Sequence, residues 1–191
     1  MKNVVCAIIL LGLYSSDVFA DWSLDSNASH ISFISVKALD IAEVHSFGII
    51  DGEISDKGKA AIAIDLASVD TGIPIRNERM MTLLFNTEEF PLADVRAKLD
   101  KGLLQDLQPG QTIEVDVELE LNLHGTKLPI ETTLSVARLS ETALTVSSIR
   151  PLIVNAASVG LSAGVEELRK IANLPSISGA VPVSFALKFV R

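Results

Sequence analysis

Cysteine and histidine, which often hold metals or carry nucleophilic chemistry, are scarce in this sequence of 191 residues. Its single cysteine, Cys6, lies in a leading segment that we expect to be removed, so the mature chain has no disulfide and no thiol. The three histidines, His30, His45 and His124, are too scattered for a metal site, and we expect each to be a polar surface or loop residue. The sequence therefore predicts no metal centre and no resident cofactor.

No apolar run in the sequence is long enough to cross a bilayer, which takes roughly 20 residues. The almost wholly apolar stretch Val4–Tyr14 follows a positive Lys2 and precedes Val18–Ala20, the three-part layout of a cleaved secretory signal peptide. We expect residues 1–20 to be removed and residues 21–191 to form one domain in the periplasm, without stable membrane insertion.

Positive charge is also in short supply. Lysine and arginine number 16 against 24 aspartate and glutamate residues, which gives a formal net charge of −8 at pH 7. No basic patch with interleaved aromatic residues occurs, and an acidic surface repels phosphates, so a nucleic-acid partner is not expected. The acidic residues alternate with apolar ones along the chain, which indicates a solvated outer face.

Alternation of apolar and polar residues is the pattern that the sequence has in abundance. Between Ile113 and Leu123 every second residue is apolar, and Val181–Phe189 repeats the pattern. Successive side chains of a strand point to opposite faces, so each of these segments has one dry face and one wet face. Such strands build an antiparallel sheet whose apolar side must be covered.

Turn signals and changes of period divide the rest of the chain. Pro74 opens a predicted short helix that ends near Asn86, and a second short helix is expected over residues 164–174. Strands are expected over residues 22–24, 31–39, 44–54, 60–69, 94–100, 113–123, 128–139, 142–148, 152–157 and 181–189. These elements predict an all-β protein, either an antiparallel barrel of about eight strands or a two-sheet sandwich. Pattern alone does not separate the two.

Residues 160–164 spell G-x-S-x-G, the motif of a hydrolase nucleophile elbow. That class needs an acid and then a histidine after the serine, and no histidine or aspartate follows Ser162. The antiparallel pattern also disagrees with the parallel sheet of such hydrolases. We therefore interpret Ser162 as a helix cap and expect no enzymatic activity.

Two arginines, Arg76 and Arg79, stand in the first turns of the helix after Pro74, next to the flexible side chain of Met80. A helix start attracts anions, and a basic pair beside flexible apolar groups suits a ligand with an anionic head and an oily tail. The alternative is that the arginines form surface ion pairs with acidic residues nearby, namely Glu78, Glu88 or Glu89.

Three segments of the sequence resemble the YceI-like family. They are Ser68–Pro91 (SVDTGIPIRNERMMTLLFNTEEFP), Leu121–Glu131 (LNLHGTKLPIE) and Ala172–Phe189 (ANLPSISGAVPVSFALKF). They occur in the family's order, and the resemblance covers essentially the whole predicted mature chain. It implies a lipocalin-like fold, an extended antiparallel barrel with a helix over one side. It also implies an exported bacterial protein that binds polyisoprenoid or other long-chain lipids.

Motif positions of the family can be carried over to this chain. The resemblance places the family's aspartate–threonine pair on Asp70 and Thr71, its arginine-containing helix on residues 76–85, and its aromatic–proline step on Phe90 and Pro91. Many members have a second basic residue and an acidic residue late in that helix. In this chain those positions hold Met81, Thr82, Leu83 and Leu84. The difference favours a neutral or weakly polar lipid over one with a pyrophosphate head.

We therefore predict a lipocalin-like barrel that sequesters a long-chain apolar molecule: a polyisoprenoid, a quinone-like lipid or a fatty-acid-derived chain. The residues expected to line its pocket or mouth are Phe33, Phe47, Ile64, Leu66, Arg76, Met80, Leu84, Val115, Val117, Leu119, Leu134, Val136, Phe185 and Leu187. The alternative is a non-catalytic stress-response or interaction module whose barrel is filled by its own side chains. The sequence is compatible with a homodimer. It is also compatible with a membrane redox partner, which a quinone-like ligand would make plausible.

Overall fold

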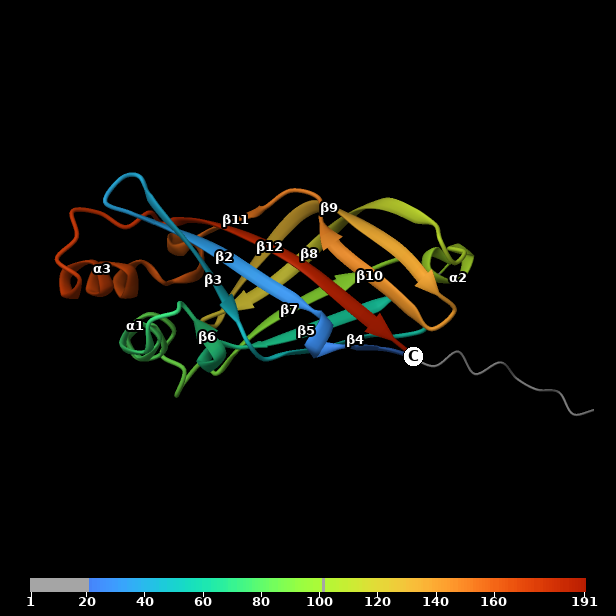
Figure 1. Ribbon diagram of the computed structural model, residues 1–191, viewed down its shortest axis with the longest axis horizontal. Helices are drawn as coiled ribbons and strands as arrows, with labels where there is room; N and C mark the ends of the chain where they lie inside the picture. The colour runs from blue at the N-terminus through green and yellow to red at the C-terminus, as the bar shows by residue number, and fades with distance from the viewer. Residues whose placement is uncertain (1–20, 101) are drawn as a thin grey trace, which may run out of the picture.

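The structure, a computed structural model, describes residues 21–100 and 102–191 (Figure 1). The predicted signal peptide, residues 1–20, lies outside the described residues. The strands are β1 (Trp22–Leu24), β2 (His30–Lys37), β3 (Ile41–Phe47), β4 (Ile50–Ile54), β5 (Lys59–Asp65), β6 (Val69–Asp70), β7 (Leu92–Lys98), β8 (Thr112–Leu123), β9 (Thr126–Ser140), β10 (Ala143–Ser148), β11 (Leu152–Asn155) and β12 (Ala180–Val190). The α-helices are α1 (Pro74–Arg79), α2 (Leu103–Asp106) and α3 (Ser162–Ile171). The π-helix is η3 (Met80–Phe85), and the 3-10 helices are η1 (Ser26–Ala28), η2 (Leu66–Ser68) and η4 (Ala156–Val159).

Eight of these strands close into an antiparallel barrel. They follow one another in the order β1, β4, β5, β7, β8, β9, β10 and β12, and β12 pairs again with β1. The ladder of β8 and β9 runs from Thr112 opposite Ala137 to Leu123 opposite Thr126. This closed ring confirms the predicted all-β, lipocalin-like barrel, and it excludes the two-sheet sandwich.

The sheet continues beyond the ring through β2, β3 and β6. β12 pairs with β1 near its C-terminal end and with β2 further back, through Val183–Ala186. The single strand expected over residues 44–54 is interrupted near Gly48 and forms two strands, β3 and β4. The Gly48 N–H donates to the carbonyl oxygen of Ser68, at the end of η2. In the same way, η2 interrupts the strand expected over residues 60–69. Neighbouring strands therefore bend at the same level of the barrel.

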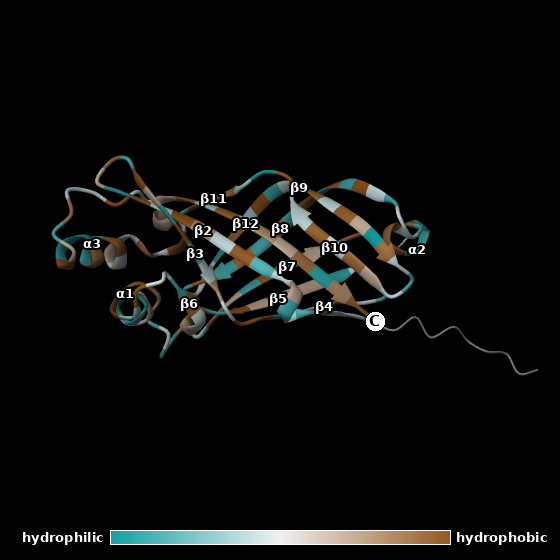
Figure 2. Cartoon of the chain, viewed as in Figure 1, coloured by the Kyte–Doolittle hydropathy of each residue, from teal (hydrophilic) through white to brown (hydrophobic). Residues whose placement is uncertain are grey.

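Strand β8 shows how the alternating pattern becomes a barrel wall. Val117, Leu119 and Leu121 are buried, whereas Asp116 before them and Glu118 between them are exposed. Hydrophilic and hydrophobic residues alternate in the same way along other strands of the barrel (Figure 2). The predicted one-sided strands are therefore present, with their apolar side turned to the interior.

The short helix α2, which was not among the predicted elements, covers one end of the barrel (Figure 1). Arg138 of β9 lies beneath it with only 5% of its surface exposed. Its guanidinium donates to the main-chain oxygens of Leu104, Ser140 and Glu141 and lies 4.9 Å from the ring centroid of Trp22. A helix of four residues has no periodicity to detect, so tertiary contacts define it.

The other helices, α1, η3 and α3, lie at the opposite end of the molecule (Figure 1). The predicted capping role of Ser162 is wrong, because α3 begins at Ser162 itself, with Leu161 as its N-cap and no side-chain cap. The side chain of Leu161 is buried and anchors this turn, while Ser162 is exposed. Within the described chain, no helix is both long enough and apolar enough to cross a bilayer.

Candidate ligand-binding cavity

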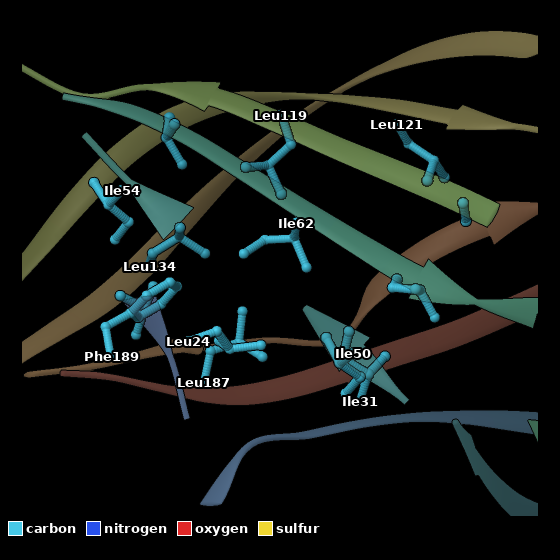
Figure 3. Packing of buried hydrophobic residues seen from close by; sticks show 14 of the residues in the cluster. Leu24, Ile31, Ile50, Ile54, Ile62, Leu119, Leu121, Leu134, Leu187 and Phe189 are labelled. Atoms are coloured by element: carbon cyan, nitrogen blue, oxygen red, sulfur yellow. The ribbon is translucent and has the colours of Figure 1, made fainter. Parts of the chain in front are cut away.

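The barrel encloses a cavity of about 490 Å³ with a predominantly apolar wall. This volume lies in the range of ordinary ligand pockets, roughly 300–1,000 Å³. Ile62 of β5, Leu119 and Leu121 of β8, and Leu134 of β9 contribute to the wall. Figure 3 shows these side chains reaching from separate strands toward a common interior. The interior is therefore only partly filled by the protein's own side chains.

Most of the predicted ligand-lining residues lie on this wall. They are Phe33, Phe47, Ile64, Leu66, Arg76, Met80, Leu84, Leu119, Leu134, Phe185 and Leu187. Val115, Val117 and Val136 do not line the cavity and belong to the packed core and its flank. Alternation identifies which residues of a strand point into the barrel. It does not tell whether an inward residue lines the cavity, as Leu119 does, or packs with the core, as these valines do.

Several wall residues are absent from the predicted set. They include Ile31, Ile62, Val95, Leu121, Val146, Leu161, Val165 and Leu168. The strand residues among them could have been predicted, because residues two apart share one face of a strand: Ile62 shares a face with Ile64, and Leu121 with Leu119. Leu161 and Val165 come from the start of α3, whose position over the barrel depends on tertiary packing.

The cavity opens between α1–η3 and α3. Ile73 and Ile75, which belong to the α1 region, line it while keeping 44% and 52% of their surfaces exposed. On either side, Met80 and Leu84 of η3 and Val165 of α3 face the same space. We call this opening the mouth.

Close packing of α3 on η3 narrows the mouth, and it depends on Gly164. A Cβ atom at this glycine would lie 2.6 Å from the carbonyl oxygen of Leu83 and 2.7 Å from the Cα of Leu84. Real Cβ atoms do not approach backbone atoms this closely, so only glycine permits the two helices to touch here.

A group of polar side chains interrupts the apolar wall near the mouth. We call it the polar patch; it consists of Ser35, Lys37, Glu43, His45, Arg76 and Arg79. The β2–β3 register sets Phe33 opposite His45 and Ser35 opposite Glu43, which places polar and aromatic residues on the same inner face. The expectation that His45 is a surface or loop residue is wrong, because it is 4% exposed within β3.

Ion pairs hold one side of the polar patch. Arg76 donates from one terminal nitrogen to Glu43 at 2.8 Å and from the other to the carbonyl oxygen of Thr71 at 2.5 Å. Lys37 lies 2.6 Å from the same carboxylate, and its hydrogen bond, with the charge of Arg76, lowers the pKa of Glu43. Arg76 therefore uses an acidic partner from β3 rather than any of the three glutamates suggested by the sequence.

His45 forms the other side of the polar patch. Its Nε2 lies 2.8 Å from the Ser35 hydroxyl, and its ring packs 5.1 Å from that of Phe33, centroid to centroid. Burial lowers the pKa of His45, and the positive charge of Arg76 lowers it further. A neutral imidazole is therefore the favoured form at neutral pH.

The G-x-S-x-G serine takes no part in the cavity. Ser162 is exposed in the first turn of α3 and does not line the wall. Across residues 21–100 and 102–191, the histidine, aspartate and glutamate side chains form no group that could hold a metal ion.

Solved structures share this architecture. The chain is similar to a polyisoprenoid-binding domain from Saccharophagus degradans implicated in plant cell wall breakdown, with 42% sequence identity and a TM-score of 0.87 over 88% of this chain and 97% of that one. It has the fold of Burkholderia cenocepacia BcnA, at 18% identity and a TM-score of 0.67 over 86% and 98% of the two chains. The Campylobacter jejuni YceI protein also has this fold, at 10% identity and a TM-score of 0.53 over 77% and 84%.

Comparison with curated proteins finds no match. The model of the YceI-like domain family, in contrast, matches residues 22–189, nearly all of the described chain. Sequence and fold thus agree over the whole barrel, and the chain belongs to the YceI-like family.

Proposed function

We propose that this protein sequesters a long-chain apolar lipid inside its barrel: a polyisoprenoid, a quinone-like lipid or a fatty-acid-derived chain. The observation that carries the proposal is the apolar cavity of about 490 Å³ that opens between α1–η3 and α3. The similar domain from Saccharophagus degradans, itself polyisoprenoid-binding, supports it. The room left inside the barrel favours a guest over an interior filled by the protein's own side chains.

Burial of apolar surface would supply most of the binding energy. Each Å² of apolar surface removed from water contributes about 25 cal/mol, so an extended hydrocarbon chain binds strongly with few polar contacts. The wall offers aromatic and aliphatic side chains such as Phe33, Leu119 and Phe185 along its length. The protein then acts by holding its ligand rather than by transforming it.

Export to the periplasm is part of the same proposal. YceI-like proteins are generally exported, and the first residues of this chain have the layout of a secretory signal. N-terminal sequencing of the protein recovered from a periplasmic extract should find a chain that begins at Asp21. Recovery of an intact Met1 in the cytoplasmic fraction alone would refute this part of the proposal.

Organic extraction of the protein purified from its own host tests the function directly. Mass spectrometry of the extract should find a long-chain lipid at close to one molecule per protein. As a matched pair, Ala93→Leu adds bulk to the cavity wall, whereas Ala63→Leu adds the same bulk to a β5 residue off the wall. The first variant should yield less lipid or shorter chains than the second. An extract without stoichiometric lipid from the unmodified protein would favour the self-filled barrel.

A further inference from the structure

The polar patch carries unbalanced positive charge inside an otherwise apolar wall. Lys37, Arg76 and Arg79 face the cavity, and Glu43 supplies the negative charge among these wall residues. Glu43 is shared between Lys37 and Arg76, while the side chain of Arg79 has no hydrogen bond or ion pair to any of the described residues. The patch therefore disfavours a cationic group and favours an electron-rich one.

Two nitrogens of the polar patch are buried without a hydrogen-bond partner: Nδ1 of His45 and Nε of Arg76. Leaving a buried polar group unpaired lowers the stability of the fold, and native structures rarely do so. Both nitrogens are covered by protein atoms when the cavity is empty, but the side chains that carry them form part of its wall, so a small rotation of either side chain turns its nitrogen toward the cavity. A ligand in the cavity is the natural source of the missing partner.

The chemistry of these nitrogens defines that partner. A guanidinium nitrogen can only donate, so Arg76 Nε requires an acceptor. The Ser35 hydroxyl has no partner among the described residues other than His45 Nε2, and its proton is satisfied when it donates to that nitrogen. The imidazole then carries its own proton on Nδ1, which becomes a second donor.

We propose that the polar patch is a head-group subsite in which His45 and Arg76 donate to an acceptor oxygen of the ligand, of the carbonyl or carboxylate type. This inference rests on the proposed lipid-binding function and specifies its ligand: an oxygenated long-chain lipid rather than a hydrocarbon or a long-chain amine. The apolar chain extends from the patch into the barrel, past wall residues such as Phe33 and Leu119. His45 is then a specificity-determining residue.

Matched ligands and variants test the inference. Delipidated protein is loaded with the neutral fluorescent dye N-phenyl-1-naphthylamine, which is displaced by 2-heptadecanone, palmitate, 1-heptadecene or hexadecylamine. His45→Phe keeps a ring against Phe33 but removes both nitrogens, and Arg76→Lys keeps the charge near Glu43 but removes the Nε–H group. Ser46→Ala, next to His45 but off the cavity wall, is the control.

The unmodified protein should bind the ketone about three- to tenfold more tightly than the alkene, the range expected for one or two hydrogen bonds. His45→Phe and Arg76→Lys should each lose much of this preference, taken as the ratio of ketone affinity to alkene affinity in the same variant, and Ser46→Ala should keep it. Palmitate bound more tightly than the ketone would identify a carboxylate ligand, and equal binding would identify a neutral carbonyl.

Failure of the inference differs from failure of the proposed function. If ketone and alkene bind equally, or if both variants keep the preference for the ketone, the head-group subsite is refuted while the lipid-binding barrel stands. Tighter binding of hexadecylamine than of the ketone would refute it as well. If no ligand displaces the dye from the unmodified protein, both proposals fail. Alkene affinity alone reports on the packing of the cavity wall, so the ratio of ketone affinity to alkene affinity within each variant decides the inference.

Discussion

The guanidinium of Arg138 donates a hydrogen bond of 2.9 Å to the main-chain oxygen of Leu104, 34 residues earlier in the chain. This contact holds α2 across one end of the barrel.

Arg138→Met would leave the buried oxygen of Leu104 without a donor and release α2. We expect the free energy of unfolding to fall by about 3 kcal/mol in urea denaturation. Arg150→Met, an exposed arginine, should change it by less than about 0.5 kcal/mol. Equal effects would show that α2 is not held in this way.

The contact between α3 and η3 leads to a second prediction. In Gly164→Ala the new methyl group collides with the backbone of Leu83 and Leu84, so α3 must move outward. We expect a loss of about 1–3 kcal/mol in stability, typical of overpacking, together with faster release of a bound lipid because the mouth widens. Stopped-flow dye displacement measures the release rate. Ala163→Ser, on the exposed face of the same turn, should leave both quantities unchanged.

The alternating faces of β8 allow a direct comparison between neighbours. Leu119→Asp places an unpaired charge on the buried cavity wall, and we expect it to destabilise the fold by more than about 3 kcal/mol or to abolish lipid uptake. Glu118→Ala removes an exposed charge and should do little. Thermal unfolding and dye binding measure both effects. Similar losses in the two variants would contradict the assignment of faces.

Acid should weaken the fold through His45. Its folded-state pKa is lowered by burial and by Arg76, with Lys37 acting in the same direction and Glu43 and Asp70 opposing. The unfolded chain therefore takes up the proton first, and the free energy of unfolding should fall as the pH drops below about 6.5. Urea denaturation between about pH 7.5 and about pH 5.5 measures this loss. Staying in this range avoids the carboxylate of Glu43, whose pKa is also lowered.

The variant His45→Phe supplies the control for this pH dependence. It lacks the titrating group, so its stability should change less over the same interval than that of the unmodified protein. Identical pH profiles would mean that His45 is not responsible.

Under the proposed function, chain length should govern affinity, because burial of apolar area would supply most of the binding energy. In a homologous series of methyl ketones, each added CH₂ group should contribute up to about 0.8 kcal/mol until the cavity is full. Calorimetry should then find a plateau at a particular length, and Ala93→Leu should move it to shorter chains, unlike Ala63→Leu. Affinity that is independent of chain length would argue against binding in the barrel.

The one-sided strands could be predicted from sequence because they obey a simple rule, whereas the choice of a barrel over a sandwich rested on the resemblance to the YceI-like family. Along β8 and β12 every second residue is apolar, which fixes the inward face, and the hairpin turns at Ser55–Gly58 and His124–Gly125 fix neighbouring strands. The breaks at Gly48 and Ser68 were not predictable in this way. They arise from a hydrogen bond between segments that are distant in sequence.

Arg76 and Arg79 of the polar patch were predicted from the sequence, but its strand residues escaped prediction because β2 and β3 do not follow that rule. On the inner face of β3, Glu43 and His45 precede Phe47, so the face mixes charged, polar and aromatic residues. Its partners come from β2 and α1, and only the fold brings Arg76 to Glu43. A pattern based on hydropathy assigns such residues to the surface, although burial and pairing here place them in the wall of the cavity.

A barrel that is closed at one end determines the direction in which a ligand can enter it. Under the proposed function, α2 and Arg138 close one end of the barrel, so a chain-like ligand would enter with its apolar end first and keep its head group beside the mouth. Release of the ligand would follow the same path in the opposite direction. Any transfer of the ligand to or from another molecule would then take place at the mouth, with the head group presented first.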